Sequence, residues 1–259
     1  MSVFLIAVVG FAVGTVVGLT GVGGASLMTP ILMALGLNPL AAVGSDLAMT
    51  VPSRLYSAAL HYRNGNVNLG IVKALCAGGI PAAIAGLLVL HWVRQVVDLH
   101  TIHTWISRSI GACLFLAAAL IVAGAFYKPA ADGSDRSRSS RALTLRIVAI
   151  GAVVGFIVTI TSIGSGSLTL PLLAIFSPAI ALPELIGSDI VFSAVLVPVA
   201  AAGHWSMGDV HPWLALNLLA GALPGTYFGT KWCRALHQRW LRPAVALVLV
   251  VAGTRLLAI

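Results

Sequence analysis

Two glycine- and serine-rich stretches interrupt apolar parts of the chain. They are Gly21-Val22-Gly23-Gly24-Ala25-Ser26 and Ser162-Ile163-Gly164-Ser165-Gly166-Ser167. A helix that starts at such a break leaves its first N–H groups unpaired, and these donors favour an anion. Glycine lets a ligand approach the backbone, and serine hydroxyls add donors. The predicted ligand contacts are Gly21, Gly23, Gly24, Ser26, Gly164, Ser165, Gly166 and Ser167. The alternative is close helix packing through small residues.

Two Ser-Asp pairs lie at equivalent points of apolar segments. They are Ser45-Asp46 and Ser188-Asp189, and they include two of only seven acidic residues in the chain. An ionised carboxylate inside a membrane costs a few kcal/mol or more unless it is paired or protonated. Both pairs are therefore candidates to carry a coupling proton or bind a coupling cation. Local capping of a nearby helix start is an equally good interpretation.

Arg54 is the cationic candidate for binding an anion. Its planar guanidinium suits a pair of oxygens on a sulfonate, sulfite, carboxylate or phosphate group. Arg54 also lies only seven residues before His61, so its side chain could instead extend to the membrane surface. The second half of the chain has Val197 at the equivalent position, so any role of Arg54 is asymmetric.

His61 and His204 are the titratable candidates near neutral pH, and a proton relay at each is conceivable. A structural role at the membrane surface is the simpler interpretation, because Tyr62 and Trp205 beside them resemble interfacial aromatic residues. The other histidines fall in expected loops or segment ends. His100 and His103 alone are a weak metal signal, and we predict neither a metal nor a cofactor.

These motifs recur at a nearly fixed offset, which indicates an internal duplication. Gly44-Ser45-Asp46 recurs as Gly187-Ser188-Asp189, 143 residues later. The same offset relates His61 to His204, Gly65 to Gly208, Val67 to Val210, Gly78 to Gly221, Pro81 to Pro224 and Gly86 to Gly229. The two glycine-rich breaks match at an offset of 141. Duplicated halves that each contain a broken segment are typical of secondary transporters.

The composition requires a membrane as solvent. Of the 259 residues, 59% are hydrophobic and 8% are charged, whereas a soluble domain carries about 25% charged residues. The net charge of +8 does not indicate nucleic-acid binding, because no basic stripe is interleaved with aromatic residues. The three cysteines lack metal-ligand spacing, and we interpret them as small buried hydrophobes.

Hydropathy predicts ten apolar segments in one transmembrane domain that covers residues 1–259. They are roughly 3–20, 25–36, 39–61, 69–91, 103–127, 142–160, 166–177, 183–204, 211–231 and 240–258. Segments 25–36 and 166–177 span about 18 Å, too little for a hydrocarbon core of about 30 Å. Each therefore forms a discontinuous or re-entrant pair with the segment before it. The resulting parity predicts an all-α polytopic protein of two inverted repeats, 1–127 and 142–259, joined by a linker at 128–141.

The basic residues predict the orientation. A cytoplasmic linker 128–141 places eleven lysines and arginines on the cytoplasmic side and three on the other. Cytoplasmic loops of membrane proteins carry such an excess. Both termini are then extracytoplasmic, and we expect a bacterial inner-membrane protein. The start of the chain lacks a basic region before its apolar run, so we expect no cleaved signal peptide.

Three motifs together resemble the sulfite exporter TauE/SafE family of bacterial membrane transporters. They are Gly18-Leu19-Thr20-Gly21-Val22-Gly23-Gly24 running to Pro30, Val43-Gly44-Ser45-Asp46-Leu47, and His61-Tyr62-Arg63-Asn64-Gly65-Asn66-Val67. The resemblance covers essentially the whole chain. It implies movement of sulfite, an organosulfonate or a related small anion, and it does not choose among them.

The sequence thus predicts a secondary transporter, most simply an exporter, of a small sulfur-containing anion. It would work by alternating access in the lipid bilayer, with a proton as a candidate coupling ion and without a nucleic-acid partner. An anion channel remains an alternative, because selectivity needs only oriented donors. An intramembrane enzyme is a weaker alternative, because serine and histidine pairs such as Ser57 and His61 lack an orienting acid. We therefore predict no catalytic residues.

Overall fold

The computed structural model describes residues 3–20, 25–126, 141–177, 180–233 and 238–258, which form ten helices. They are α1 (Val3–Thr20), α2 (Ala25–Ala34), α3 (Pro39–Arg63), α4 (Leu69–Val96), α5 (Leu99–Phe126), α6 (Arg141–Thr161), α7 (Thr169–Phe176), α8 (Leu182–Ser206), α9 (Pro212–Cys233) and α10 (Gln238–Leu257). Each predicted apolar segment corresponds to one helix, so the all-helical prediction is confirmed. The largest differences are at α4 and α5, which extend into the expected loop and place His91, His100 and His103 in helices.

Four of these helices are long and apolar enough to cross a membrane. They are Leu69–Val96, Leu99–Val122, Arg141–Thr161 and Leu182–Ser206. Helices α2 and α7 have ten and eight residues, which confirms two short helices that each follow a break in the chain. At about 1.5 Å per residue, neither can span a hydrocarbon core. The chain therefore folds as a multi-pass helical membrane protein.

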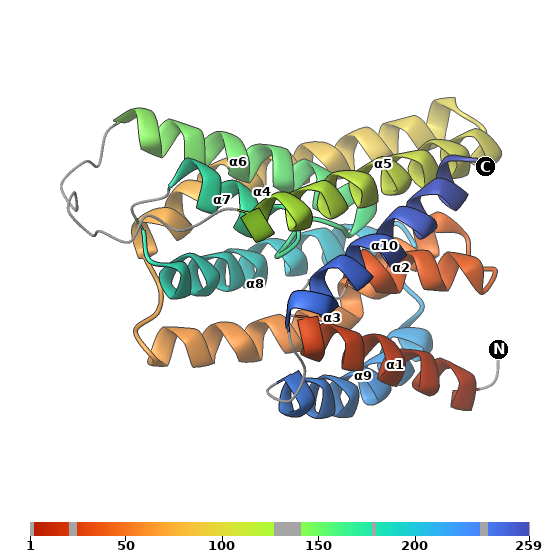
Figure 1. Ribbon diagram of the computed structural model, residues 1–259. Coiled ribbons are helices and arrows are strands. Elements are labelled where there is room, and N and C mark those ends of the chain that lie inside the picture. Colours follow the sequence, from red (N-terminus) through yellow and green to blue (C-terminus); the bar gives the residue numbers. More distant parts are fainter. Residues whose placement is uncertain (1–2, 21–24, 127–140, 178–179, 234–237, 259) are drawn as a thin grey trace.

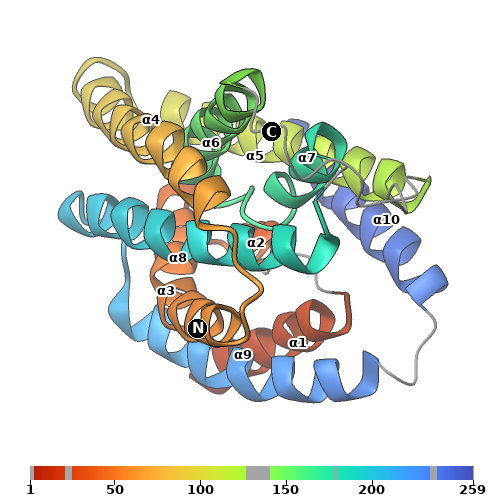
Figure 2. The ribbon, with the colours of Figure 1, turned by 90° about the vertical axis from the view of Figure 1, so that its left-hand side faces the viewer.

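The helices pack in pairs that join one half of the chain to the other. Helix α1 lies along α9, and α4 lies along α6. Helices α3 and α8 pack against each other between these two pairs, and α5 packs against α10 (Figures 1 and 2). The core is consequently shared: residues of α3 and α8 are the most continuously buried, and neither half encloses its own core.

Small residues let the two helices within each outer pair, α1 with α9 and α4 with α6, approach until their backbones are in contact. A Cβ atom at Gly14 would strike the backbone of Ala222, and one at Gly155 would strike the backbone of Gly79. The reciprocal glycines behave alike, because a Cβ at Gly221 would strike the backbone of Ala7. Close approach gains dispersion contacts, which hold membrane helices together where burial from water cannot.

The turns after α3 and α8 have the same backbone. Gly65 and Gly208 adopt φ angles of +70° and +80°, a left-handed conformation that favours glycine. In each turn the glycine N–H and the next N–H bond back to helix carbonyls, as in a Schellman motif. The turns, 64–68 and 207–211, lie at opposite ends of the bundle (Figure 1). These ends of the molecule are called the 64–68 end and the 207–211 end.

Asparagine caps and first-turn prolines mark the starts of α3, α4 and α8. The Asn38 side chain accepts a hydrogen bond of 2.8 Å from the Ala41 N–H, and Pro39 occupies the first helical position of α3. The Asn68 side chain accepts bonds from the N–H groups of Gly70 and Ile71 at the start of α4. Pro183 lies in the first turn of α8, a position that proline favours at helix starts.

Candidate functional site

Asp46 lies at the centre of the polar core. Its side chain is fully buried, and one carboxylate oxygen, Oδ2, accepts hydrogen bonds from Thr29 at 2.9 Å and from Ser162 at 2.8 Å. Thr29 belongs to α2, and Ser162 belongs to the second glycine-rich break. The other oxygen, Oδ1, is buried without a partner among the described residues. Asp46 therefore joins both halves of the chain and keeps one acceptor available.

Ser162 has an uncommon backbone conformation. Its φ is +61°, the only positive value at a non-glycine residue in the described part of the chain. A non-glycine residue held in the left-handed region costs of order 1–3 kcal/mol, and such residues gather at functional sites. Ser162 in this conformation directly follows the last residue of α6, and its hydroxyl donates a hydrogen bond to Asp46. The second break is thus fixed in position by a carboxylate from the first half.

Asp189 is the counterpart of Asp46 on α8. It is 2% exposed, and its Oδ1 is also buried without a partner among the described residues. Thr169 and the backbone of Gly166 lie beside its side chain. The two aspartates therefore face the second break from two different helices, and each has an unused carboxylate oxygen.

Arg54 supplies the positive charge of this centre. Its guanidinium donates a hydrogen bond of 3.4 Å to the Ser165 carbonyl oxygen, and its charge acts on both Asp46 and Asp189. The side chain is partly buried. The structure therefore places Arg54 at the second break and not at the membrane surface.

The other break residues divide into two groups. Gly21, Gly23 and Gly24 lie outside the described residues. Ser26, Ser165 and Ser167 are almost fully buried. Gly164 and Gly166 have φ angles of +148° and +87°, so the second break needs glycine at both positions. The N-terminus of α7 begins directly after it, at Thr169, without a side-chain cap.

The side chains of Ser45 and Ser188 do not point into the polar centre, unlike those of the aspartates that follow them. The Ser45 hydroxyl accepts a hydrogen bond of 3.1 Å from the His211 N–H, and the Ser188 hydroxyl accepts one of 2.9 Å from the Asn68 N–H. His211 and Asn68 are themselves 143 residues apart. Each serine thus fixes the start of a helix in the other half, while the adjacent aspartate points into the polar centre.

The two histidines have different environments. His204 is fully buried in the last turn of α8. Its Nδ1 lies 2.9 Å from Asp209 Oδ2, and its Nε2 lies 2.8 Å from the Thr159 carbonyl oxygen. His61 is partly buried, and its Nδ1 has no partner among the described residues. Trp205 is exposed, as expected for an interfacial residue.

Asp209 connects His204 to a third charged residue. Arg94, on α4, forms an ion pair with the same Asp209 oxygen, Oδ2, and donates a second bond to the Met207 carbonyl. Burial raises the pKa of Asp209, but the hydrogen bonds from His204 and Arg94 outweigh this and hold the pKa below its ordinary value. This charged group lies at the 207–211 end, and the Thr159 carbonyl links it to the last turn of α6.

Sequence patterns had not singled out Thr29, Arg94 or Asp209. A threonine in an apolar helix carries little signal, because its partner is distant in the chain. Asp209 did carry one: it is one of seven acids and corresponds to Asn66 in the first half. Among the described residues, no three His, Cys, Asp or Glu side chains are arranged to hold a metal ion.

An all-helical bundle with apolar spans around a buried polar centre defines the class of a multi-pass membrane protein. The model of the family "Sulfite exporter TauE/SafE" matches residues 6–256. The chain therefore belongs to the TauE/SafE sulfite exporter family, a family of membrane transporters and not of enzymes. The resemblance found in the sequence motifs is confirmed.

Relatives from Bacillus subtilis (strain 168) span the same length. The probable membrane transporter protein YjnA is 37% identical over 99% of this chain and 100% of its own length. The probable membrane transporter proteins YdhB and YunE are 26% and 25% identical, over 98% and 99% of this chain and 99% and 98% of their own lengths. No solved structure matches the chain.

Proposed function

We propose that the protein moves a small sulfur-containing anion, such as sulfite or an organosulfonate, across the bacterial inner membrane by alternating access. The observation that supports this most is the convergence of Arg54, Asp46 and Asp189 on the second glycine-rich break. The guanidinium and the start of α7 provide positive potential, and glycine admits a ligand to the backbone. The family indicates a transporter, and these groups favour an anion as its substrate.

The two carboxylates make proton coupling a natural part of the proposal. With both ionised, Asp46 and Asp189 outweigh the single charge of Arg54, and an entering anion would be repelled. Uptake of a proton by either aspartate removes that repulsion and gives the unpaired Oδ1 atom a hydrogen to donate. Binding of anion and proton would then support each other, as coupled transport requires.

The packing supports two inverted repeats. The contacts of α1 with α9 and of α4 with α6 are reciprocal, as are those of Ser45 with the α9 start and Ser188 with the α4 start. A two-fold relation in the membrane plane would produce such pairs. Rocking of one bundle against the other would then expose the polar centre to each side in turn.

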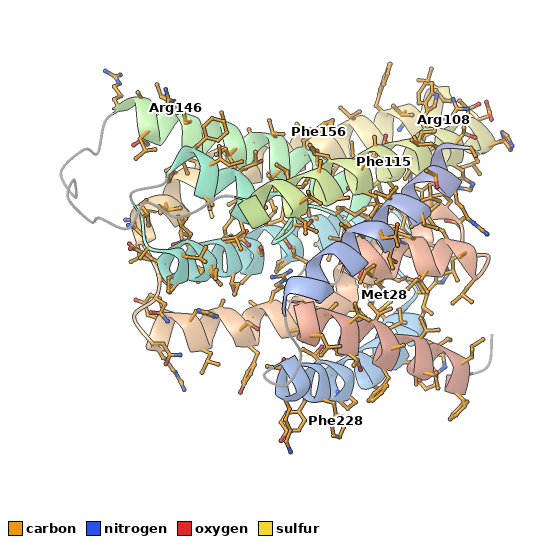
Figure 3. The ribbon with its side chains drawn as sticks, in the orientation of Figure 1. Met28, Arg108, Phe115, Arg146, Phe156 and Phe228 are labelled. Atoms are coloured by element: carbon orange, nitrogen blue, oxygen red, sulfur yellow. The ribbon has the colours of Figure 1, made fainter. Side chains whose placement is uncertain are left out.

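Charge supports the proposed orientation, with the 64–68 end and the linker cytoplasmic and both termini extracytoplasmic. Arg146 marks the basic-rich end and Arg108 the opposite end (Figure 3). In the same view Met28, buried in α2, points into the bundle, whereas Phe228 on α9 points away from it. Exposed apolar side chains of this kind suit contact with lipid.

Substrate binding is tested by thermal unfolding of the detergent-purified protein with sulfite, thiosulfate, sulfoacetate, taurine, sulfate and chloride. A ligand that binds only the folded state stabilises it by RT ln(1 + [L]/Kd). We expect selective stabilisation by sulfite or a sulfonate, with Kd raised roughly tenfold or more in Arg54→Gln, because a hydrogen bond to a charged group contributes about 1.5–3 kcal/mol. Arg63→Gln is the control, because Arg63 is exposed at the end of the same helix.

Coupling is tested in liposomes with an imposed pH gradient. Asp46→Asn should abolish the dependence of anion flux on the gradient, whereas Asp98→Asn, in the loop between α4 and α5, should leave it intact. An Asp46→Asn protein whose flux still follows the gradient removes Asp46 from the coupling role. Flux that does not saturate with anion concentration and needs no counter-ion would indicate a channel instead.

A further inference from the structure

The group formed by Arg94, His204, Asp209 and the Thr159 carbonyl has a geometry that determines where protons lie. A backbone carbonyl only accepts hydrogen bonds, so His204 Nε2, at 2.8 Å from Thr159 O, carries a hydrogen. His204 Nδ1 faces Asp209 Oδ2 at 2.9 Å. That oxygen also receives the Arg94 guanidinium. An oxygen in an ion pair with arginine is a carboxylate oxygen, so Nδ1 also carries a hydrogen.

His204 is therefore doubly protonated in this arrangement, with both nitrogens donating. The lowered pKa of Asp209 agrees with this, because it keeps the carboxylate ionised at neutral pH. The imidazolium is fully buried, and it shares the Asp209 carboxylate with Arg94. Loss of one His204 proton leaves one ring nitrogen as an acceptor that faces another acceptor, either Asp209 Oδ2 or the Thr159 carbonyl oxygen, and so breaks one of the two contacts.

The contact joins elements that belong to different halves. Arg94 lies near the end of α4, His204 lies in the last turn of α8, Asp209 lies in the turn before α9, and Thr159 lies near the end of α6. Arg94 also bonds to the Met207 carbonyl, so α4 is tied to the 207–211 turn twice. The equivalent turn at the other end has Asn66 in place of Asp209, so Asn66 itself supplies no carboxylate there.

We propose that His204 is a proton-binding site that closes the 207–211 end of the protein: doubly protonated His204 and Arg94 together hold the end of α8 and the 207–211 turn against α6 and α4, and release of one His204 proton removes one of these contacts and lets the end of α8 separate from the α4–α6 pair. This inference rests on the alternating-access part of the proposed function, and it adds the group that fixes one closed state.

Other charged groups face the same region from neighbouring helices. His103 on α5 interacts electrostatically with Arg94 and Asp209, and His100 lies beside it. The described part of α6 near Thr159 presents only a backbone carbonyl to His204. His103 is the best matched control, because it is a titratable histidine near the same ion pair that makes no contact with the Asp209 carboxylate among those described.

The test measures the opening itself, without substrate. Spin labels at Gln95→Cys on α4 and Ser206→Cys on α8, both exposed, report the separation of the two elements in a protein whose native cysteines are replaced. Double electron–electron resonance from about pH 5 to about pH 9 covers the range in which histidine titrates. We expect one short distance at low pH and a second, longer population as the pH rises.

Three variants decide the assignment. His204→Gln, which keeps a donor for Thr159 but cannot titrate, should abolish the pH dependence, and His103→Gln should preserve it. Asp209→Asn should show the longer distance at every pH. A wild-type distance that ignores pH, a dependence that survives His204→Gln, or one that is lost equally in His103→Gln would overturn the proposal.

Folding is checked separately for each variant by size-exclusion chromatography and by near-native helical content. The spin-label distances involve no anion, so the outcome is independent of which substrate is transported. A protein that binds sulfite but shows no pH-dependent opening refutes this inference alone. A protein that opens with pH but binds none of the anions refutes the proposed substrate alone.

Discussion

The turn after α3 carries Asn66, and the turn after α8 carries Asp209 at the equivalent place. Both turns use a left-handed glycine, Gly65 or Gly208, and both are followed by a helix start held by a serine of the opposite half. Among the described residues, the second turn contains an ion pair of Asp209 with Arg94, with His204 beside it, whereas the first turn is bonded to a single acid, Glu184. The backbone is thus common to both ends, and the described ion pair belongs to one.

The two turns share their backbone structure and differ in their side chains. Backbone hydrogen bonds and glycine contacts must be kept in both halves, because they decide how the helices fit together. A side chain in the turn can change once the backbone is fixed, and Asp in place of Asn creates an ion pair with a helix of the other half. The two ends can then open under different conditions.

The largest expected effect comes from breaking the charged end. Asp209→Ala leaves the Arg94 and His204 charges without a partner, and breaking a buried ion pair typically costs about 3–5 kcal/mol. Asn66→Ala at the other end removes no charge and should cost far less. Thermal unfolding of both variants in the same detergent measures the difference. Equal effects at the two ends would mean that the charges at the 207–211 end contribute little.

A second comparison uses Gly229 and Gly86, which the sequence offset makes equivalent. A Cβ at Gly229 would strike the Thr15 backbone, whereas one at Gly86 would make ordinary contacts with Thr159. Gly229→Ala should therefore destabilise the protein by about 1–3 kcal/mol through overpacking. Gly86→Ala should be neutral, or stabilising by up to about 1 kcal/mol from helix propensity. Unfolding curves that coincide for the two variants would show that α1 and α9 can separate freely.

A third comparison tests the feature that the two halves share. Ser45→Ala and Ser188→Ala each remove a hydrogen bond to a helix start in the other half, and each should cost about 0.5–1.5 kcal/mol. The double variant should lose the sum of both, because the sites lie at opposite ends of the bundle. A strong departure from additivity in the measured stabilities would indicate that the ends are coupled.

The smallest expected effect is a loss of folding stability at acid pH that depends on Asp209. Its pKa in the folded protein is held below the ordinary value of 3.8, so its stabilising contribution is present above that value and is lost as the pH falls through the lower folded pKa. The effect is smaller than that of Asp209→Ala, because a protonated carboxyl still fills its space and forms hydrogen bonds. Melting temperatures between about pH 5 and pH 3 should fall more steeply in the wild type than in Asp209→Asn.

Much of the fold could be predicted from the sequence because each signal is local. The apolar runs predicted ten segments, and each corresponds to one helix of the structure. The shortness of α2 and α7 followed from run length alone. The sequence placed Asp46 and Asp189 in apolar segments. It did not predict that each serine would bond to a helix start while the adjacent aspartate points into the polar centre, because the partners of Ser45 and Ser188 are more than a hundred residues away.

By itself, the sequence determined the membrane environment, the helices and the family, because composition, apolar runs and motifs are properties of the chain. The tertiary structure decided which polar groups meet. Ser162 reaches Asp46, Arg54 reaches the Ser165 carbonyl, and Arg94 reaches Asp209, each across more than a hundred residues. The physical reason is that a buried polar group must find its partner wherever packing brings one, and packing joins residues without regard to their separation along the chain.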